Sequence, residues 1–205
     1  MQNKEWTVNS EYLFYEDHKI SLKNINLKGL HQLDNAALAA IGCLIVEKLK
    51  VKKSDIEKGI KDTKWNGRIQ KLEGKLSKTY DDLDIWIDSA HNVLGFKSLL
   101  SWMKTYNTKQ FLIISVGKNK DIKSIINEIS YSKLIKIIIL ESNNDYFHNS
   151  YKIKKICDEF GLLSFIADDL DHALGYCLST NIKARVVITG SIYFISDVIR
   201  LDKNL

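Results

Sequence analysis

Apolar residues in the second half of the chain fall into five short runs, and amphipathic segments separate them. The segments at 93–105, 121–131, 150–160 and 169–179 have the periodicity and length of helices. The apolar runs are expected to be strands and occupy 84–88, 111–116, 136–140, 162–166 and 185–189. Strands that alternate with helices pair in parallel through right-handed crossovers. The pattern therefore predicts an α/β fold with a Rossmann-like, mostly parallel open sheet flanked by helices.

The amino-terminal part predicts a smaller set of elements. Tyr12–Leu22 alternates apolar and polar residues around a polar centre, which is typical of a two-stranded hairpin. From Asp34, the run DNAALAAIGCLIVEKL is apolar on all sides and predicts a deeply buried helix. A second helix is expected at Ser54, where Ser54 and Glu57 have the spacing of a capping box.

Composition limits the class of protein. The chain has 205 residues, of which 45% are hydrophobic and 27% charged, as in ordinary globular proteins. We find no internal repeat, low-complexity tract or Gly/Ser-rich linker. Residues 26–205 are therefore expected to form one α/β domain, and residues 1–25 a connector. Proline is absent, so a motif that lacks its usual proline is weak grounds for rejecting that motif.

Charge and cysteine usage exclude several partners. The net charge is +5, but the lysines are spread along the chain and no nucleic-acid-binding module accompanies them, so we expect anionic small molecules and no nucleic acid. Cys43, Cys157 and Cys177 are widely spaced in apolar sequence and predict buried thiols, with neither disulfides nor a metal site. The chain has no signal-peptide core and no apolar run of about 18 residues, which predicts a cytoplasmic protein without a membrane span.

Polar residues follow the first predicted strand of the sheet. In DIWIDSAHN, Asp88 ends the strand, and His91 and Asn92 lie in the turn before the next helix. Because ligands bind parallel sheets at the carboxyl ends of the strands, Asp88 could accept hydrogen bonds from ribose hydroxyls, and the helix amino terminus favours phosphate oxygens. Alternatively, Asp88 and Asn92 cap the helix.

Three further positions are candidates for binding. Arg68 follows a glycine in WNGRIQ, and a guanidinium binds phosphate oxygens bidentately, although a lone arginine is commonly a surface charge. Asp34 and Asn35 lie at the start of the apolar helix, where capping is the better interpretation. Ser191 follows Gly190 at a strand end, where it could contact a ligand or cap the next helix.

The chain lacks the familiar catalytic motifs. It contains no Walker A sequence, no nucleophile motif and no histidine or cysteine pair with metal-ligand spacing. The residues alone thus predict a Rossmann-like domain that binds a phosphate compound.

Four segments, in order, resemble one known family. GLHQLDNAALAA, WNGRIQ, DIWIDSAHN and VVITGSIYF are similar to the carboxyl-terminal part of the folylpolyglutamate synthase/dihydrofolate synthase family, which is related to the Mur ligases. The resemblance implies a Mur ligase C-terminal-type domain at 26–205 and a remnant of the central ATPase domain at 1–25. It also implies an activity in which ATP phosphorylates the carboxylate of folate or dihydropteroate, and the amino group of glutamate attacks the acyl phosphate.

The resemblance assigns roles to five residues. Asn35, Arg68 and Asp88 match positions that contact ATP, while His91 and Ser191 match positions that support catalysis or glutamate binding. The chain departs from the family where Asn66 and Val93 replace prolines, and in a shorter loop at 116–121.

The family's phosphate loop, magnesium ligands and carbamylated lysine would lie before Met1. Because phosphoryl transfer depends on those groups, we expect no ligase activity from this chain unaided. One hypothesis is half of a split ligase that acts with a separate amino-terminal chain. The alternatives are a stand-alone nucleotide- or anion-binding module and the non-functional product of a truncated gene.

Overall fold

The computed structural model describes residues 5–46, 48, 50–132, 135–142, 144–180 and 183–203. The chain divides into two compact units, Met1–Asn66 and Gly67–Leu205. The expected change of domain lay at residue 25, whereas the first unit extends to Asn66 because its two helices share a core with the amino-terminal strands. The assignment of residues 1–25 to a central-domain remnant stays a prediction.

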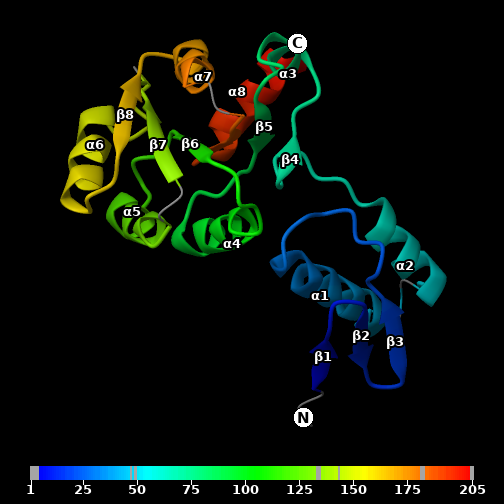
Figure 1. The fold of residues 1–205 in the computed structure, drawn as a ribbon. Coiled ribbons are helices and arrows are strands. Elements are labelled where there is room, and N and C mark those ends of the chain that lie inside the picture. The colour runs from blue at the N-terminus through cyan, green and yellow to red at the C-terminus, as the bar shows by residue number, and fades with distance from the viewer. Residues whose placement is uncertain are drawn as a thin grey trace. The chain divides into compact units, whose positions relative to one another are not determined.

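The first unit is a small antiparallel sheet with two helices. Its strands are β1 (Trp6–Val8), β2 (Tyr12–Tyr15) and β3 (His18–Ser21), paired in the order β1-β2-β3. The predicted hairpin is β2 and β3, and β1 was not predicted. Helices α1 (His31–Ile45) and α2 (Lys53–Asp62) complete the unit (Figure 1). The core consists of buried Leu13, Tyr15, Ile20, Leu22, Ala37, Ala40, Ile41 and Ile56.

Helix α1 differs from its prediction in two respects. It begins after Leu30, which gives no side-chain cap, so the interpretation of Asp34 or Asn35 as the cap is wrong; both lie within the first turns. The helix is also not deeply buried, because only the side that faces the small sheet is covered, while Leu38 is 55% exposed and Ile45 is 60% exposed.

Helix α2 begins one residue earlier than predicted. Its first turn is held by the Lys52 N–H, which donates to Asp55 at 3.2 Å, so the proposed pairing of Ser54 with Glu57 is wrong. Glu57 instead accepts a hydrogen bond from the Ser21 N–H at 2.8 Å and ties α2 to β3.

The second unit is built on a six-stranded sheet in the order β4-β5-β9-β6-β7-β8. All neighbours pair in parallel except β4 and β5, which confirms the mostly parallel open sheet. The unpredicted β4 is the antiparallel edge strand. The strands are β4 (Gln70–Lys71), β5 (Asp84–Ile87), β6 (Gln110–Ile114), β7 (Ile135–Leu140), β8 (Ser164–Ala167) and β9 (Arg185–Thr189).

Helices cover both faces of this sheet (Figure 1). One face packs on α4 (Val93–Met103), α5 (Ile122–Ser130) and α6 (Ser150–Glu159). The other packs on α3 (Lys75–Thr79), α7 (Leu170–Ser179) and α8 (Ile192–Lys203). Along β6, Leu112 points to the first core and Phe111 and Ile113 point to the second. Burial on both faces explains why the strands read as continuous apolar runs.

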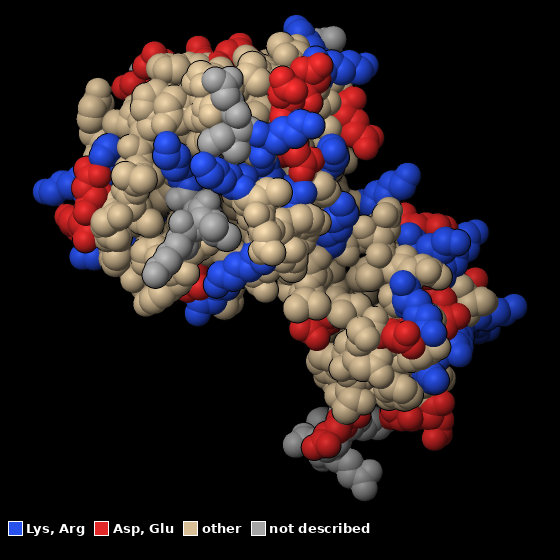
Figure 2. Space-filling view, viewed as in Figure 1, with Lys and Arg blue, Asp and Glu red and all other residues tan. Residues whose placement is uncertain are grey.

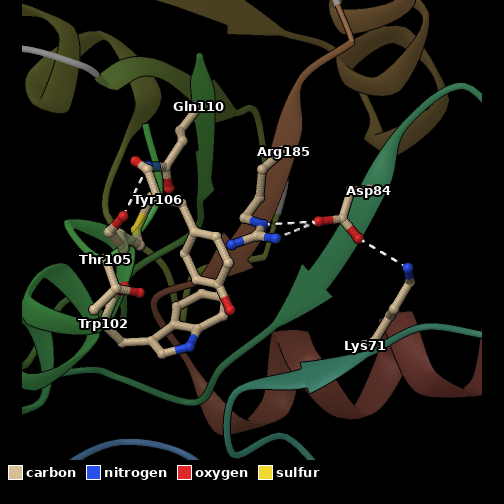
Figure 3. Close-up of polar contacts among 8 residues, drawn as sticks. Lys71, Asp84, Trp102, Thr105, Tyr106, Gln110 and Arg185 are labelled. Atoms are coloured by element: carbon tan, nitrogen blue, oxygen red, sulfur yellow. Dashed lines mark hydrogen bonds and ion pairs between the residues drawn. The ribbon is translucent and has the colours of Figure 1, made fainter. Parts of the chain in front are cut away.

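The amino ends of three adjacent strands carry a partly buried charged cluster (Figure 3). Arg185 begins β9 and pairs in register with Asp84 of β5 and Gln110 of β6. Its guanidinium donates to the Asp84 carboxylate at 2.6 and 2.8 Å, and its central carbon lies 3.5 Å from the centre of the Tyr106 ring. Lys71 bonds the other Asp84 oxygen at 3.0 Å. Although partial burial opposes it, hydrogen bonds from Trp86, Lys71 and Arg185 hold the pKa of Asp84 below its usual range.

The cysteines are free, and two of them are fully enclosed. Burial raises the pKa of Cys157 to about 11 and that of Cys177 to about 12. Cys43 is only half-buried, although it packs against the core of the first unit, so the prediction of three buried thiols is wrong at that position.

Candidate functional site

The carboxyl ends of β5 and β9 form a point where the chain leaves the sheet in opposite directions. The two strands are parallel neighbours, but β5 continues into α4 on one face and β9 continues into α8 on the other. Open α/β sheets bind ligands at such switch points. The Asp88 N–H donates to the Ile188 carbonyl at 3.0 Å, so the segments that follow the two strands start side by side.

The Asp88 carboxylate is buried and organises the local backbone. One oxygen accepts from the Ile69 N–H at 3.0 Å and the other from the Ala90 N–H at 2.8 Å. Asp88 therefore does not cap α4. Burial raises the pKa of the Asp88 carboxyl, although the two backbone hydrogen bonds and the charges of Arg68 and His91 act in the opposite direction. The residue is 6% exposed, so most of its surface is used by the protein itself.

The segment before β4 is held against the end of β5 in an unusual conformation. Gly67 has φ +73°, and a Cβ there would lie 2.7 Å from the Ser89 hydroxyl and 2.9 Å from Ile195. Its carbonyl accepts from the Ser89 N–H at 2.8 Å. Ile69 has φ +43°, which is strained for a β-branched residue, yet its side chain is buried. The bond from Ile69 to Asp88 helps to hold this strained backbone.

Arg68 lies between these two fixed residues. It is half-buried, and its positive charge acts on the Asp88 carboxyl. Among the described residues, none forms a hydrogen bond or ion pair with its guanidinium. A guanidinium that is held in place but forms no ion pair with a protein carboxylate is suited to bind phosphate oxygens.

His91 and Asn92 follow in the turn between β5 and α4. The His91 Nδ1 lies 2.9 Å from the Ser89 carbonyl oxygen; since that oxygen can only accept, Nδ1 carries a proton, and in the neutral ring Nε2 carries the free lone pair. Asn92 caps α4 by accepting from the Gly95 N–H at 2.8 Å, which confirms the capping interpretation for Asn92.

Gly190 and Ser191 close the site at the end of β9. Gly190 has φ +116°, and a Cβ there would lie 2.5 Å from the Ser115 carbonyl oxygen, so β9 and the end of β6 approach too closely for any side chain. The Ser191 carbonyl accepts from the Ile195 N–H, and its hydroxyl oxygen accepts from the Tyr193 N–H at 3.2 Å. Ser191 therefore caps the first turn of α8, and it is 2% exposed.

The structure brings four of the five predicted residues to one edge of one sheet: Arg68, Asp88, His91 and Ser191. Asn35 lies in the other unit, exposed on α1, where its amide donates to Gln32 at 3.1 Å.

Sequence reasoning missed a hollow of about 360 Å³ beside α8. Tyr146 and Tyr193 contact each other edge to face at 5.0 Å in its wall, and Tyr193 is 61% exposed. Part of this hollow could have been found from the sequence, because Tyr193 is two residues from Ser191. Tyr146 could not, because it is distant from Ser191 along the chain.

The loop after β6 is anchored to the segment after β7. Gly117 bridges to Phe147, and the Lys118 N–H donates to the Tyr146 carbonyl at 2.8 Å. The short loop at 116–121 is therefore ordered by its neighbour.

The described part of the chain contains neither a candidate metal cluster nor a candidate membrane span. Within it, no group of three or more His, Cys, Asp and Glu side chains could hold a metal ion. Nor does any described helix combine the length and the apolar character required to cross a membrane. In Figure 2, basic and acidic side chains are interspersed over the visible face.

The comparisons with known proteins agree on one group of enzymes. The dihydrofolate synthase/folylpolyglutamate synthase of Bacillus subtilis is 26% identical over 203 residues, which cover 95% of this chain and 43% of that protein. No family model matches the chain.

Solved structures share the fold at lower identity. A Mycobacterium tuberculosis folylpolyglutamate synthase complexed with ADP and AMPPCP has a TM-score of 0.77 at 18% identity, covering 97% of this chain and 46% of that one. Escherichia coli FolC in complex with ADP has a TM-score of 0.73 at 17% identity, covering 98% and 46%.

The chain therefore spans less than half the length of the proteins it matches. This coverage is consistent with the four motifs, which resemble the carboxyl-terminal part of the family's sequences. In sequence and in fold, the chain is similar to the carboxyl-terminal part of folylpolyglutamate synthase/dihydrofolate synthase.

Proposed function

We propose that this chain is the carboxyl-terminal part of an ATP-dependent ligase that adds glutamate to folate or dihydropteroate. The observation that supports this most is that Arg68, Asp88, His91 and Ser191, identified from the sequence motifs, converge on one switch point of the sheet. The relative of Bacillus subtilis supports the same class of reaction.

The residues at the edge fit a nucleotide phosphate. Arg68 supplies a forked cation with no hydrogen-bond acceptor among the described residues, and its charge acts on Asp88. The amino terminus of α4 follows His91 and Asn92 directly in the chain. When bound, ATP would supply the phosphoryl group that activates the substrate carboxylate. Arg68 would then offset the negative charge of the phosphate oxygens.

His91 is proposed to act on the glutamate side. With Nδ1–H donated to the Ser89 carbonyl, Nε2 is available to accept a hydrogen bond or a proton from the attacking amino group. Ser191, which is buried, would orient the start of α8 and direct its own hydroxyl proton towards the glutamate.

Asp88 is proposed to assist nucleotide binding chiefly by positioning the backbone that carries Arg68. Its two oxygens hold the backbone on both sides of the strand end, and the Ile69 bond fixes the loop that presents Arg68. The predicted ribose contact would use the remaining lone pairs of the same carboxylate. Asn35 is proposed as a nucleotide contact from the first unit, where its amide is exposed.

We propose that the chain is inactive unaided. It contains no Walker A sequence, and the magnesium that the reaction requires would be held by the half of the relatives that this chain does not span. A separate amino-terminal ligase chain is the corresponding partner. A cytoplasmic location is proposed on the free cysteines.

The test is a folate ligation assay that requires ATP and glutamate. The purified chain is assayed alone, mixed with the phosphate-loop half of the Bacillus subtilis relative, and fused to that half. Activity in the mixture or the fusion, abolished by Arg68→Ala, is expected. Activity of the chain alone would contradict the proposed dependence, and tight nucleotide binding with no ligation in any format would favour a stand-alone binding module.

A further inference from the structure

The outward side of helix α1 is apolar but exposed. Leu38 is 55% exposed, Ile45 is 60% exposed and Val46, at the end of the helix, is 46% exposed; Ala39 and Gly42 are exposed between them. These five residues are called the α1 outer face. Their spacing of three, four and seven places them on one stripe, opposite the side that packs on the small sheet.

The composition of α1 is that of a helix covered on both sides. Asp34 is the sole acidic residue of its fifteen residues, and the helix contains no lysine or arginine. A helix that is hydrophobic all round is normally buried all round. The prediction that α1 is deeply buried is therefore wrong for one face of the helix, the α1 outer face, and not for the side that packs on the small sheet.

Helix α2 is an internal control. It belongs to the same unit and also contributes to the core, through Ile56, but its exposed positions include Lys53, Lys58 and Lys61. The chain thus places charged residues on a helix face that meets water. The apolar outer face of α1 is not a general property of the unit.

The small sheet of the same unit also has an open edge. Strand β1 is an edge strand that, among the described strands, pairs only with β2, and its Trp6 is 36% exposed. Open edges and exposed apolar patches are both places where further polypeptide adds.

The lengths of the relatives indicate what covers these surfaces. The chain spans 43% of the Bacillus subtilis protein and 46% of the Mycobacterium tuberculosis protein, so more than half of each has no counterpart here. We propose that the α1 outer face is the docking surface for a polypeptide equivalent to that unspanned, phosphate-loop-bearing half. This proposal rests on the proposed function for the identity of the partner, but it concerns binding and not catalysis.

The experiment measures binding with variants of the full chain. Leu38→Glu/Ile45→Glu places two charges on the outer face, and Leu201→Glu is the matched control because Leu201 is equally exposed, at 55%, on α8. Sedimentation velocity measures the complex with the phosphate-loop half of the Bacillus subtilis relative. We expect a one-to-one complex whose dissociation constant rises at least about 30-fold in the double variant and less than about twofold in the control, since a 30-fold change corresponds to about 2 kcal/mol.

Hydrogen exchange gives an answer that does not depend on the variants folding. In the wild-type complex, amides of Leu38 to Val46 should exchange more slowly than in the free chain, while those of α2 should not change. Unaltered exchange in α1, or a complex that the double variant forms with wild-type affinity, would overturn the docking surface. A chain that binds no partner, or that buries the outer face in its own dimer, would overturn it as well.

The ligation assay of the fusion separates this proposal from the proposed function. In a fusion, docking no longer depends on concentration. If the fusion is active but the separate chains form no complex, the proposed function stands and the proposed docking surface is rejected. If the separate chains form a complex but the fusion is inactive, the docking surface stands and the proposed function is rejected.

Discussion

The two ends of the parallel sheet both hold buried or half-buried charged groups, but the protein neutralises these groups in different ways. At the amino end, Arg185 is met by the Asp84 carboxylate and by the Tyr106 ring. At the carboxyl end, Asp88 is met by backbone N–H groups, and Arg68 is left without a protein partner among the described residues. The cation of the first end is thus paired with a protein carboxylate, whereas the cation of the second has no ion-pair partner among the described residues.

At the carboxyl end, the backbone should tolerate no side chain at Gly190 without a loss of stability. Gly190→Ala should lower the free energy of unfolding by about 4 kcal/mol, because it combines left-handed strain with overpacking against the Ser115 carbonyl. Urea denaturation measures the change. Gly161→Ala is the control, since Gly161 has φ +66° but open space around it, and should cost about 1 kcal/mol. Equal losses would show that the close approach of β9 and β6 has no energetic weight.

The amino end should depend on its ion pair. Arg185→Ala is expected to lower the free energy of unfolding by about 3 kcal/mol, because it leaves Asp84 short of a partner and empties a space lined by aromatic rings. Arg200→Ala removes an exposed pair with Asp197 and should cost under about 0.5 kcal/mol. A loss of less than about 1 kcal/mol for Arg185→Ala would mean that the cluster is not a structural determinant.

Arg68 should show the reverse pattern. Arg68→Ala is expected to leave the free energy of unfolding within about 0.5 kcal/mol of wild type, since no described residue pairs with it. It should weaken nucleotide binding by the reconstituted ligase about 10- to 100-fold, the loss of a charge-assisted phosphate contact. Calorimetric titration with ADP measures the affinity, and Arg68→Lys should recover part of it. A variant that unfolds more easily but binds normally would assign Arg68 to the fold.

The two carboxylates should also respond oppositely to pH. The folded pKa of Asp84 is lowered from 3.8, so its contribution to stability is present above that pH and is lost as the pH falls through the folded value. The folded pKa of Asp88 is raised from 3.8, so its contribution is present below that pH and is lost as the pH rises through the folded value. Unfolding of Asp84→Asn and Asp88→Asn between about pH 3 and 6 tests this. The wild-type advantage over Asp84→Asn should shrink towards acid pH, and that over Asp88→Asn should grow; parallel slopes would contradict the assignment.

Much of this sheet could be predicted from the sequence, because the relevant signals are local. The strands and helices after Asp84 follow from apolar runs and helical spacing, and strand direction follows from their alternation. The location of Asp88 and Ser191 at one edge follows from topology alone.

The rest depends on contacts between distant residues. Nothing local in the sequence shows that Ile69 adopts a left-handed conformation, because the hydrogen bond that helps to hold it is accepted by a carboxylate 19 residues away. The Arg185 cluster joins residues 101 positions apart. Helix α1 was misjudged because its apolar pattern predicts burial on all sides, whereas one of its faces is exposed in the described part of the chain.

The position of β9 has a consequence for how the chain folds during synthesis. This strand follows the other described strands in the sequence, yet it lies between β5 and β6, which are made about 70 residues earlier or more. Until the ribosome has released residues 185–189, β5 and β6 have unpaired backbones facing a gap at the centre of the sheet. A nascent chain that stops before Arg185 therefore cannot assemble the central sheet or the charged cluster at its amino end, and its exposed strand edges are expected to favour aggregation.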